Sequence, residues 1–508
     1  MSVDHLQKTD LHTRIPEASA DNPHHARRWW ILAVLGVAQL MIVLDATVVN
    51  IALPTAQTDL AFSDSARQWI VTAYALAFGS LLLIGGRIAD VIGRKWVFVI
   101  GLAGFAIASA VGGAAVDVGM LIGARAVQGA FAALLAPAIL SLLTTTFTDP
   151  RERAKAFGVF GAIAGTGASV GLLLGGILTE YANWRWTLFV NLFLVGIALT
   201  GGIKLLSHSK AAHRAKLDIT GTVVVTAGLF ALVYGFSHAE TDGWANGITI
   251  GMLVAAGVLL TAFVFVQQRV HNPLLPLRIV LDRNRGGSYL AMFASAAGMF
   301  AVFLFLTYYL QASQGYSAVQ TGVAFLPMTG VLVVVAGIAS SALIPRVSAR
   351  LLIPTGMAAA TVAMYLLTQI GLDTSYASHI LPSMLLLGAG LGLVFAPGFS
   401  LATLGVEASD SGVASAAVNT VQQVGGSVGT ALLNTIAATA GATYATTHAA
   451  GATSAAAGKL LQANAAVHSY TVAFWWATAI FAVGAVLSAI VLRSGVPQYD
   501  ESAETVVL

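Results

Sequence analysis

The chain contains no cysteine and few charged residues. The absence of cysteine among its 508 residues excludes disulfides, thiol catalysis and thiolate metal sites. Asp, Glu, Lys and Arg make up only 9% of the chain, against about 25% in a typical soluble domain, whereas 57% is hydrophobic. This shortage of charge predicts an integral membrane protein of the all-α class, built from apolar spans.

Motifs for several other chemistries are also missing. No Gly-rich loop ends in Lys-Ser or Lys-Thr, so we expect no direct use of ATP. The eleven His residues, such as His24 and His213, occur mostly in tails and loops without a metal-ligand arrangement. We therefore expect no enzyme activity, no metal and no cofactor. The basic residues are spread over short loops, where they face anionic lipid, and this distribution does not indicate nucleic-acid binding.

Long apolar runs fill most of the sequence. Residues 1–28 are polar, and the run that follows is too long for a cleavable signal, so we interpret 1–28 as a cytoplasmic tail. Runs of about 20 apolar residues predict fourteen membrane spans. The predicted spans are 29–52, 69–86, 96–115, 118–143, 154–178, 186–206, 219–237, 247–267, 287–310, 322–344, 352–371, 379–403, 412–441 and 470–492.

The distribution of Lys and Arg supports this count. With a cytoplasmic N-terminus, Arg67, Arg185 and Lys459 fall outside and Arg125 lies within a span, which leaves 21 of the 25 on the cytoplasmic side. A wrong count would scramble this alternation. We therefore predict fourteen spans with both termini inside, in a cell membrane.

The spans divide into two sets of six with a pair between them. The first set contains a charged turn at Gly86–Lys95. The second set retains a remnant of this turn, in which Gly337 is followed by Arg346 and Arg350. Two parallel halves around a site at the membrane midplane are typical of transporters. The predicted units are an N-terminal half at 29–206, a linker with two extra spans at 207–286, a C-terminal half at 287–492, a cytoplasmic tail at 493–508 and an external Ala/Thr-rich loop at 442–469.

Asp45 is the only carboxylate well inside any predicted span, and Arg125 is the only cation. A charge at the bilayer centre costs at least ~2.5–3.5 kcal/mol, so it needs a partner, water or a proton. Both residues lie roughly 10–12 Å below the outer surface, at ~1.5 Å per residue. We hypothesise that they form an ion pair that a proton arriving at Asp45 loosens. The alternative is a pair that only fixes helix packing.

The fifth span carries a series of glycines. Gly167, Gly171 and Gly175 recur every four residues and predict a smooth stripe where another helix approaches closely. Gly176 follows directly, and Gly158 falls on the opposite face, where it can serve a second contact. An ordinary packing seam would explain the same spacing.

A charged turn separates the second and third spans and must lie at a membrane surface. It carries Gly86, Asp90, Gly93, Arg94 and Lys95 in the spacing G-x-x-x-D-x-x-G-R-K. The basic residues can serve simply as anchors on the cytoplasmic side. A role in conformational gating is the functional interpretation.

Glu407 and Asp410 lie in a cytoplasmic loop that contains no base. Acids at this position favour the N-terminus of the following helix, which explains them adequately. They can also meet Arg94 or Lys95 across the two halves and latch the cytoplasmic side closed. Both interpretations stay open at this point.

Polar and aromatic residues inside spans are candidates for contact with a small-molecule substrate. Aromatic faces attract organic cations, and amides offer adaptable hydrogen bonds. For any one aromatic, a lipid-facing position is the competing interpretation. The candidates are Tyr74, Gln128, Phe300, Phe303, Tyr308, Asn419 and Gln422.

Together these motifs resemble the fourteen-span drug:proton antiporter family of the major facilitator superfamily. The resemblance covers essentially the whole membrane region and implies two parallel six-helix halves with two inserted helices. It also implies that Arg125 takes part in proton transfer and that the glycine series belongs to an exporter. The matching segments are Leu44–Pro54, Gly86–Lys95, Leu121-x3-Arg125-x2-Gln128-Gly129, the glycines from Gly158 to Gly176, Trp184-Arg-Trp-x2-Phe-x-Asn191 and Gly315-Tyr-Ser-x4-Gly322-x4-Pro327.

The chain departs from the family pattern at two positions. Leu172 stands where the glycine motif usually has Pro, so the bend of the fifth helix can differ. Phe193 stands where the family has a Pro after the Asn of the sixth helix.

We therefore expect a proton-coupled exporter of hydrophobic or amphipathic compounds in a bacterial cell membrane, acting as a monomer by alternating access. One alternative is an exporter dedicated to a single endogenous metabolite, such as an antibiotic or a siderophore. Another is a membrane sensor or lipid-handling scaffold that transports nothing. Proton-driven uptake is disfavoured only by the resemblance of the fifth helix.

Overall fold

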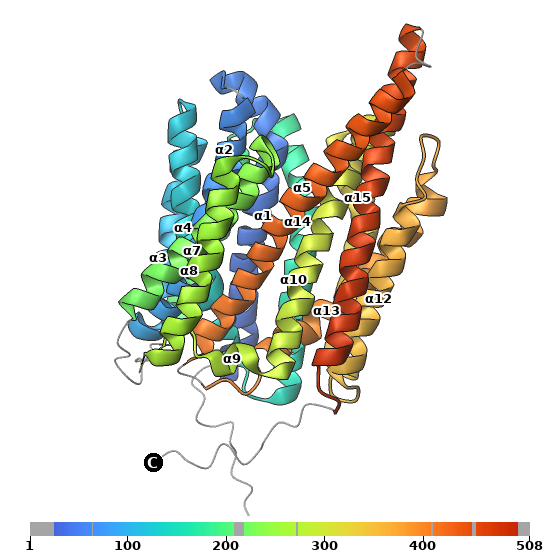
Figure 1. Ribbon diagram of the computed structural model, residues 1–508. Helices are drawn as coiled ribbons and strands as arrows, with labels where there is room; N and C mark the ends of the chain where they lie inside the picture. The colour runs from blue at the N-terminus through green and yellow to red at the C-terminus, as the bar shows by residue number, and fades with distance from the viewer. Residues whose placement is uncertain are drawn as a thin grey trace, which may run out of the picture.

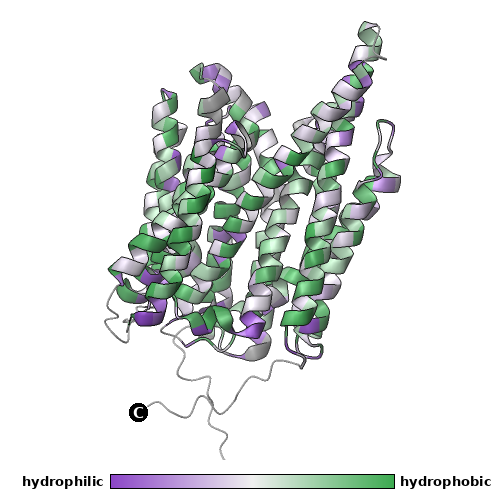
Figure 2. Ribbon diagram, in the orientation of Figure 1, coloured by the Kyte–Doolittle hydropathy of each residue, from purple (hydrophilic) through white to green (hydrophobic). Residues whose placement is uncertain are grey.

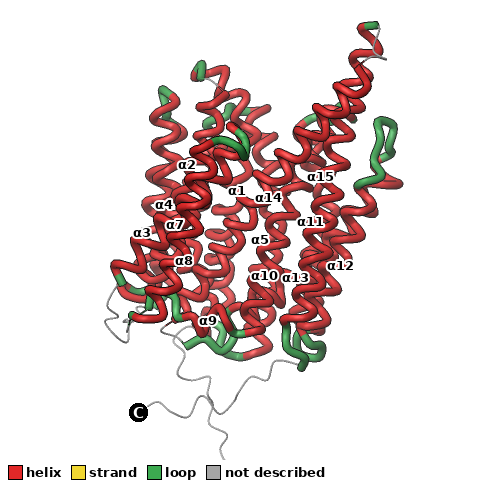
Figure 3. The backbone as a smooth tube through the Cα atoms, in the orientation of Figure 1, coloured by secondary structure: helices red, strands yellow, loops and turns green. Residues whose placement is uncertain are grey.

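The computed structural model describes residues 25–62, 64–207, 218–270, 273–407, 410–449 and 454–495. Within these ranges the chain is helical apart from short connections, and no strand occurs (Figures 1 and 3). The first-half helices are α1 (Arg28–Leu60), α2 (Asp64–Ile92), α3 (Arg94–Gly113), α4 (Val118–Thr146), α5 (Pro150–Tyr181) and α6 (Trp186–Leu205). The inserted pair is α7 (Ile219–Asp242) and α8 (Gly247–Arg269), and the short α9 (Leu277–Leu281) follows it.

The second half repeats the pattern with several π-helical segments. Its helices are α10 (Arg283–Ala301), α11 (Ala318–Ile338), α12 (Ala349–Leu367), α13 (Leu381–Ala402), α14 (Ser411–His448) and α15 (Ala455–Val491). The π-helical segments are η2 (Val302–Leu306), η3 (Tyr309–Ser313), η4 (Ala339–Leu343) and η5 (Tyr376–Ile380). Most of the predicted tails, and residues 208–217 of the predicted linker 207–286, lie outside the described residues.

Side-chain caps start several of these helices. Asp117 accepts a 2.9 Å hydrogen bond from the amide of Met120 at the start of α4. Ser317 and Gln320 form a reciprocal capping box at the start of α11. Such caps satisfy amides that lack a partner in the first turn, and the rest of each backbone bonds within its helix, as a bilayer requires.

Twelve of the described helices are long and apolar enough to cross a membrane, or thirteen if the bent α5 counts as one span. The remaining long helix, α14, is rich in Gly, Ser and Thr and does not meet that standard. Hydrophobic residues cover most of each helix, and hydrophilic residues gather toward the ends of the bundle (Figure 2). The fold is therefore that of a multi-pass membrane protein.

The two six-helix halves share one pattern of neighbours. In the first half, α1 lies against α5 and α6, α2 against α4, and α3 against α4 and α6. In the second half the corresponding helices repeat this pattern: α10 lies against α14 and α15, α11 against α13, and α12 against α13 and α15. The contacts between the halves follow the same correspondence, in which α2 matches α11 and α5 matches α14. α2 of the first half contacts α14 of the second, and α5 of the first half contacts α11 of the second. Parallel repeats of this kind are typical of transporters.

The inserted helices α7 and α8 pair with each other beside the junction between the halves. α7 contacts both α2 and α14, whereas α8 lies against α7 (Figure 1). Thr72 of α2 shares a 2.9 Å hydrogen bond with Ser237 of α7. The pair therefore covers the α2–α14 seam.

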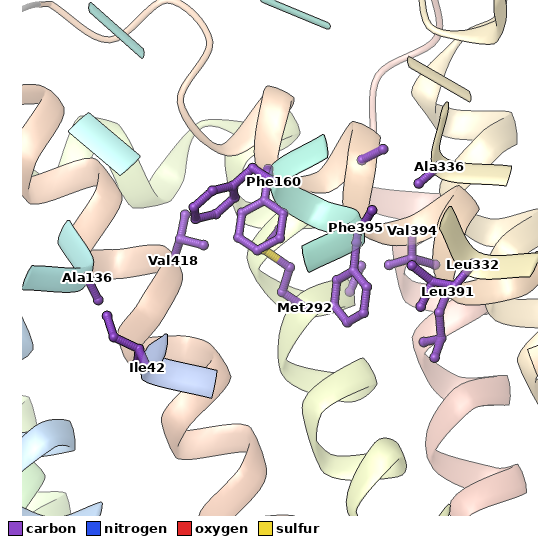
Figure 4. Packing of buried hydrophobic residues seen from close by; sticks show 14 of the residues in the cluster. Ile42, Ala136, Phe160, Met292, Leu332, Ala336, Leu391, Val394, Phe395 and Val418 are labelled. Atoms are coloured by element: carbon purple, nitrogen blue, oxygen red, sulfur yellow. The ribbon is translucent and has the colours of Figure 1, made fainter. Parts of the chain in front are cut away.

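One hydrophobic cluster extends through both halves. Phe160 of α5 is 2% exposed and meets Phe399 of α13 edge to face, with ring centroids 5.1 Å apart. Figure 4 shows Phe160 among second-half side chains that include Met292, Phe395 and Val418. The halves are thus joined by packed side chains as well as by the chain.

The predicted external loop at 442–469 is wrong in its described part. α14 continues to His448 and α15 begins at Ala455, so the two helices form a long hairpin that projects beyond the rest of the bundle (Figure 1). Alanine has the highest helix propensity, which explains why this Ala/Thr-rich segment continues as helix.

Candidate functional site

Asp45 and Arg125 meet in the interior of the first half. Asp45 lies on α1 and is 1% exposed, and Arg125 lies on α4 and is 2% exposed. Nη1 of Arg125 donates a 2.5 Å hydrogen bond to Oδ2 of Asp45. The structure therefore brings together the two charges that the sequence singled out. Two opposite charges at this depth satisfy each other where water is absent.

Two amides complete the surroundings of the Asp45 carboxylate. Oδ1 of Asp45 accepts hydrogen bonds from Nδ2 of Asn191 at 2.7 Å and from Nε2 of Gln128 at 3.1 Å. Gln128 also accepts from Arg125 at 3.0 Å and donates to Ser109 at 2.7 Å. The carboxylate thus receives three donors from α4 and α6.

Sequence reasoning missed two members of this network, Asn191 and Ser109. Both are fully buried, on α6 and α3 respectively. Asn191 does stand in the Trp184–Asn191 segment that resembles the family, and a buried amide in an apolar span is a usable signal. Ser109 gave no such signal, because a serine in a membrane helix commonly bonds to its own backbone.

Tyr74 and Gln128, which the sequence predicts to contact substrate, lie against the ion pair, and their contact with substrate stays a prediction. The guanidinium of Arg125 lies over the ring of Tyr74, 4.2 Å from its centroid. Tyr74 is 4% exposed and Gln128 is fully buried. Cation–π attraction is strongest where water is excluded, so the buried ring of Tyr74 helps to hold the Arg125 guanidinium in place.

The second-half candidates lie apart from this network. Phe303 stacks on Phe325 with ring centroids 5.4 Å apart, and Tyr308 is 48% exposed. Asn419 donates to the Ser415 carbonyl of its own helix at 2.9 Å.

Of the other second-half candidates, Gln422 is half-buried on α14, and the side chain of Phe300 lies outside the described residues. Tyr308 stands between the π-helical segments η2 and η3, and such segments are frequent at functional sites. Contact of these residues with substrate stays a prediction.

The glycines of α5 serve two different helices. A Cβ atom at Gly167, Gly171 or Gly175 would collide with or crowd α1. A Cβ atom at Gly158 would instead collide with Ser340 at the end of α11, in the other half. α5 therefore approaches α1 closely through one face and α11 through the opposite face, and Gly176 is buried beside the stripe.

α5 bends by 45° between its segments Glu152–Gly167 and Ser169–Tyr181. The bend falls at residue 168, although Leu172 replaces the family's proline. Proline at 172 would lose the helical bond to the carbonyl of residue 168 and press against it. The chain therefore bends where that proline would act, between Gly167 and Ser169, and glycine and serine are common at helix kinks.

The halves also meet at the end of the bundle predicted to be cytoplasmic. The backbones of α2 and α14 cross at Gly86 and Gly412, and the carboxylate of Asp90 accepts a 3.2 Å bond from the Gly412 amide. Arg94 donates to Ser411 at 2.7 Å, and the positive φ of +103° at Gly93 makes the turn between α2 and α3. Asp90 thus faces the N-terminus of α14, where the helix dipole favours an anion.

The predicted latch has different partners. Asp410 accepts a 2.6 Å hydrogen bond from Arg278 of α9, and Glu407 lies 3.5 Å from the same guanidinium. These acids raise the pKa of Arg278 above its ordinary value. Lys95 donates to the carbonyls of Ile203 and Leu206 at the end of α6, within its own half. The charged groups of this turn that bond across the halves are therefore Asp90 and Arg94, which reach the start of α14. Arg153 of α5 adds a further cross-half bond, to the Thr403 carbonyl at 3.0 Å.

Comparison with known sequences decides the family. Residues 35–430 match the family described as Major Facilitator Superfamily. The chain belongs to the major facilitator superfamily. It is 46% identical over 504 residues to the puromycin resistance protein pur8 of Streptomyces alboniger, covering 99% of this chain and 98% of that protein.

Two further proteins are also similar to the chain. The chain is 38% identical over 414 residues to the cephamycin export protein CmcT of Amycolatopsis lactamdurans, covering 80% of this chain and 84% of that protein. The crystal structure of the human organic anion transporter MFSD10 (TETRAN) matches with a TM-score of 0.60 and 13% identity, over 91% of this chain and 99% of that one. The latter likeness shows the fold alone. This superfamily member is a multi-pass protein of a bacterial cell membrane.

Proposed function

We propose that this chain exports hydrophobic or amphipathic compounds from the cell by alternating access and takes up protons in exchange. The proposal includes fourteen spans, both termini in the cytoplasm and a monomeric transporter. The observation that carries it is the buried pair of Asp45 and Arg125, which a proton can break. The names of the relatives support the outward direction, since pur8 is a resistance protein and CmcT an export protein.

The Asp45 carboxylate is built to hold a negative charge or a proton. As an anion it receives three donors, including Arg125, in a region where Asp45 is 1% exposed. Protonation removes the charge that Arg125 neutralises, so the guanidinium must find another partner or move. The protein therefore has two states, with Asp45 protonated and with Asp45 ionised, and the side chains around Asp45 are arranged differently in each.

Arg125 transmits this change to α2. Its guanidinium rests on Tyr74, and a Cβ atom at Gly129 on α4 would lie 2.4 Å from the Tyr74 carbonyl oxygen, so α4 and α2 touch at this level. Gly86 follows Tyr74 by twelve residues on the same helix, roughly 18 Å at ~1.5 Å per residue. A displacement of α2 at Tyr74 therefore reaches the crossing with α14, where the halves separate in an inward-open state.

The experiment uses purified protein in proteoliposomes with an imposed pH gradient and ethidium or puromycin as substrate. We expect Asp45→Asn to lower gradient-driven transport about tenfold or more, since couplings of about 1–3 kcal/mol are typical between two sites. Asp117→Asn is the matched control, because Asn caps a helix as well as Asp does and Asp117 lies outside the network. Full gradient-driven transport by Asp45→Asn would refute proton coupling at this residue.

A second candidate is a pump dedicated to one compound. The two relatives compared carry the name of a single antibiotic each, puromycin and cephamycin. A panel of puromycin, a cephamycin, ethidium and tetraphenylphosphonium separates the two functions. A dedicated pump moves one of these or none, whereas a broad exporter moves several at comparable rates.

A further inference from the structure

Asn191 of α6 has an unused acceptor beside the Asp45 carboxylate. Its Nδ2 donates to Oδ1 of Asp45 at 2.7 Å and lies 3.4 Å from Oγ of Ser109. Its Oδ1 is buried and has no hydrogen-bond partner among the described residues. A buried carbonyl oxygen without a partner is costly, so its presence at the centre of the network calls for a role.

The observed orientation of the amide corresponds to an anionic Asp45. Turning Asn191 by about half a turn would set its Oδ1 against a carboxylate oxygen, and two acceptors would face each other without a hydrogen. When Asp45 binds a proton, the situation reverses, because its new O–H group needs an acceptor. After the turn, Oδ1 of Asn191 accepts the hydrogen bond from the O–H group of Asp45. The Nδ2 donor of Asn191 then points away from Asp45.

The other neighbours of Asp45 serve this purpose poorly. Oε1 of Gln128 already accepts from Arg125 at 3.0 Å. Arg125 has only donors. Tyr74 is the remaining titratable group in contact with the pair. Its ring carries the Arg125 guanidinium, and its buried hydroxyl makes no hydrogen bond to Asp45 or to any other described residue. Asn191 is therefore the neighbour that already bonds to Oδ1 of Asp45 and also has a free acceptor.

We propose that Asn191 is the positioning residue for proton binding at Asp45: its amide donates to the anion and turns to accept from the protonated acid. The inference rests on the proposed function of Asp45. It predicts that Asn191 sets the pH at which Asp45 binds its proton, and that the amide changes orientation at each exchange. No bond between heavy atoms forms or breaks: the O–H bond of Asp45 forms when a proton arrives from water and breaks when the proton returns to water.

The test is infrared difference spectroscopy of the purified protein during a pH titration. The carboxyl band lost in Asp45→Asn reports the protonation of Asp45 directly, without transport. In Asn191→Leu the anion loses one donor, so we expect the midpoint to rise by about one pH unit or more, a roughly tenfold gain in proton affinity. A side-chain amide band that shifts with protonation in the wild type should disappear in this variant.

Two further variants of Asn191, with a control elsewhere on α6, distinguish the proposed role from misfolding and from a purely structural role. Asn191→Asp keeps the shape, and two adjacent carboxyls should titrate in two separated steps with one at higher pH. Asn191→Ser, which has both a donor and an acceptor, should restore part of the wild-type midpoint. Thr200→Val on the same helix removes a hydroxyl that donates to the Gly196 carbonyl and to no other group in the described part of the chain, so the midpoint should not change.

The possible failures are distinguishable. If no titrating band is missing from Asp45→Asn, both the proton-coupling role of Asp45 and the role of Asn191 are overturned. If the Asp45 band is present but titrates at the wild-type pH in Asn191→Leu and in a single step in Asn191→Asp, only the role of Asn191 is overturned.

Discussion

Gly86 of α2 and Gly412 of α14 cross so closely that a Cβ atom on either would lie 2.5 Å from the carbonyl oxygen of the other. The contact joins backbone to backbone, so no side-chain rotation can relieve an added methyl group. Ser141 of α4 adds a 2.8 Å hydrogen bond to Ser411 beside this crossing. The two halves therefore close at this end through a contact that tolerates only glycine.

We expect Gly86→Ala to push α2 away from α14 and to favour the state open at this end. Overpacking typically costs about 1–3 kcal/mol, which corresponds to about a 5- to 150-fold change in the ratio of the two states. The measurement is the labelling rate of a single cysteine introduced at this end. The chain has no native cysteine, so every label reports the chosen position.

Gly426→Ala is the matched control for this substitution. It lies on α14 as Gly412 does, and a Cβ atom there would meet nothing within 4 Å. Equal labelling rates in Gly86→Ala and Gly426→Ala would show that the crossing does not control access.

The acids before α14 are expected to contribute less. Arg278 is 63% exposed, so its bond to Asp410 is screened, and Arg278→Gln should change the ratio of states less than about fivefold, or ~1 kcal/mol. Asp410→Arg should change it more, because it places a cation beside both Arg278 and Arg94. The same labelling assay checks both variants, and a larger effect of Arg278→Gln would contradict this order.

The sequence located the helices and the buried pair because both follow from the cost of placing charge in a bilayer. Asp45 and Arg125 stood out as single charges in apolar spans, and counting residues placed them at similar depths. Their other partners could not be predicted in this way, because Asn191 and Ser109 depend on which faces of α6 and α3 turn toward α1. No hydrophobic pattern fixes that rotation when a helix is apolar on every side.

The contacts between halves were predicted less well, for a related reason. Arg94, Lys95 and Asp410 are all near one membrane surface, and Coulomb attraction alone permits several pairings among them. The structure selects among these by close packing, because Gly86 lets the α14 N-terminus come within reach of Asp90. Lys95 instead reaches the free carbonyls at the end of α6, which a basic residue commonly satisfies.

Gly171 and Thr47 form a pair that can be tested by compensation. A methyl group on Gly171 would collide with the hydroxyl of Thr47, two residues from Asp45 on α1. We expect Gly171→Ala to destabilise the protein by about 1–3 kcal/mol and to lower transport. Adding Thr47→Ala removes the colliding hydroxyl and should restore more than half of the lost thermal stability.

The control is Gly196→Ala on α6, where a Cβ atom would meet nothing within 4 Å. Thermal unfolding of the four proteins in detergent gives the comparison. If the double variant is no more stable than Gly171→Ala alone, the close approach of α5 to α1 is not what Gly171 provides.

The bend of α5 leads to a prediction about a residue that the chain lacks. We expect Leu172→Pro to retain at least about half of wild-type transport, because proline there frees the carbonyl of residue 168, where the helix is already bent by 45°.

Ile177→Pro is the matched comparison: the side chain of Ile177 is 38% exposed, so little packing is lost. It would break the regular helix beyond the bend at a cost of about 3 kcal/mol or more. Transport and thermal stability should both fall in Ile177→Pro and change little in Leu172→Pro. Equal losses in the two variants would mean that α5 is not prepared for proline at 172, and that the bend depends on the unbroken hydrogen bonding around residue 168.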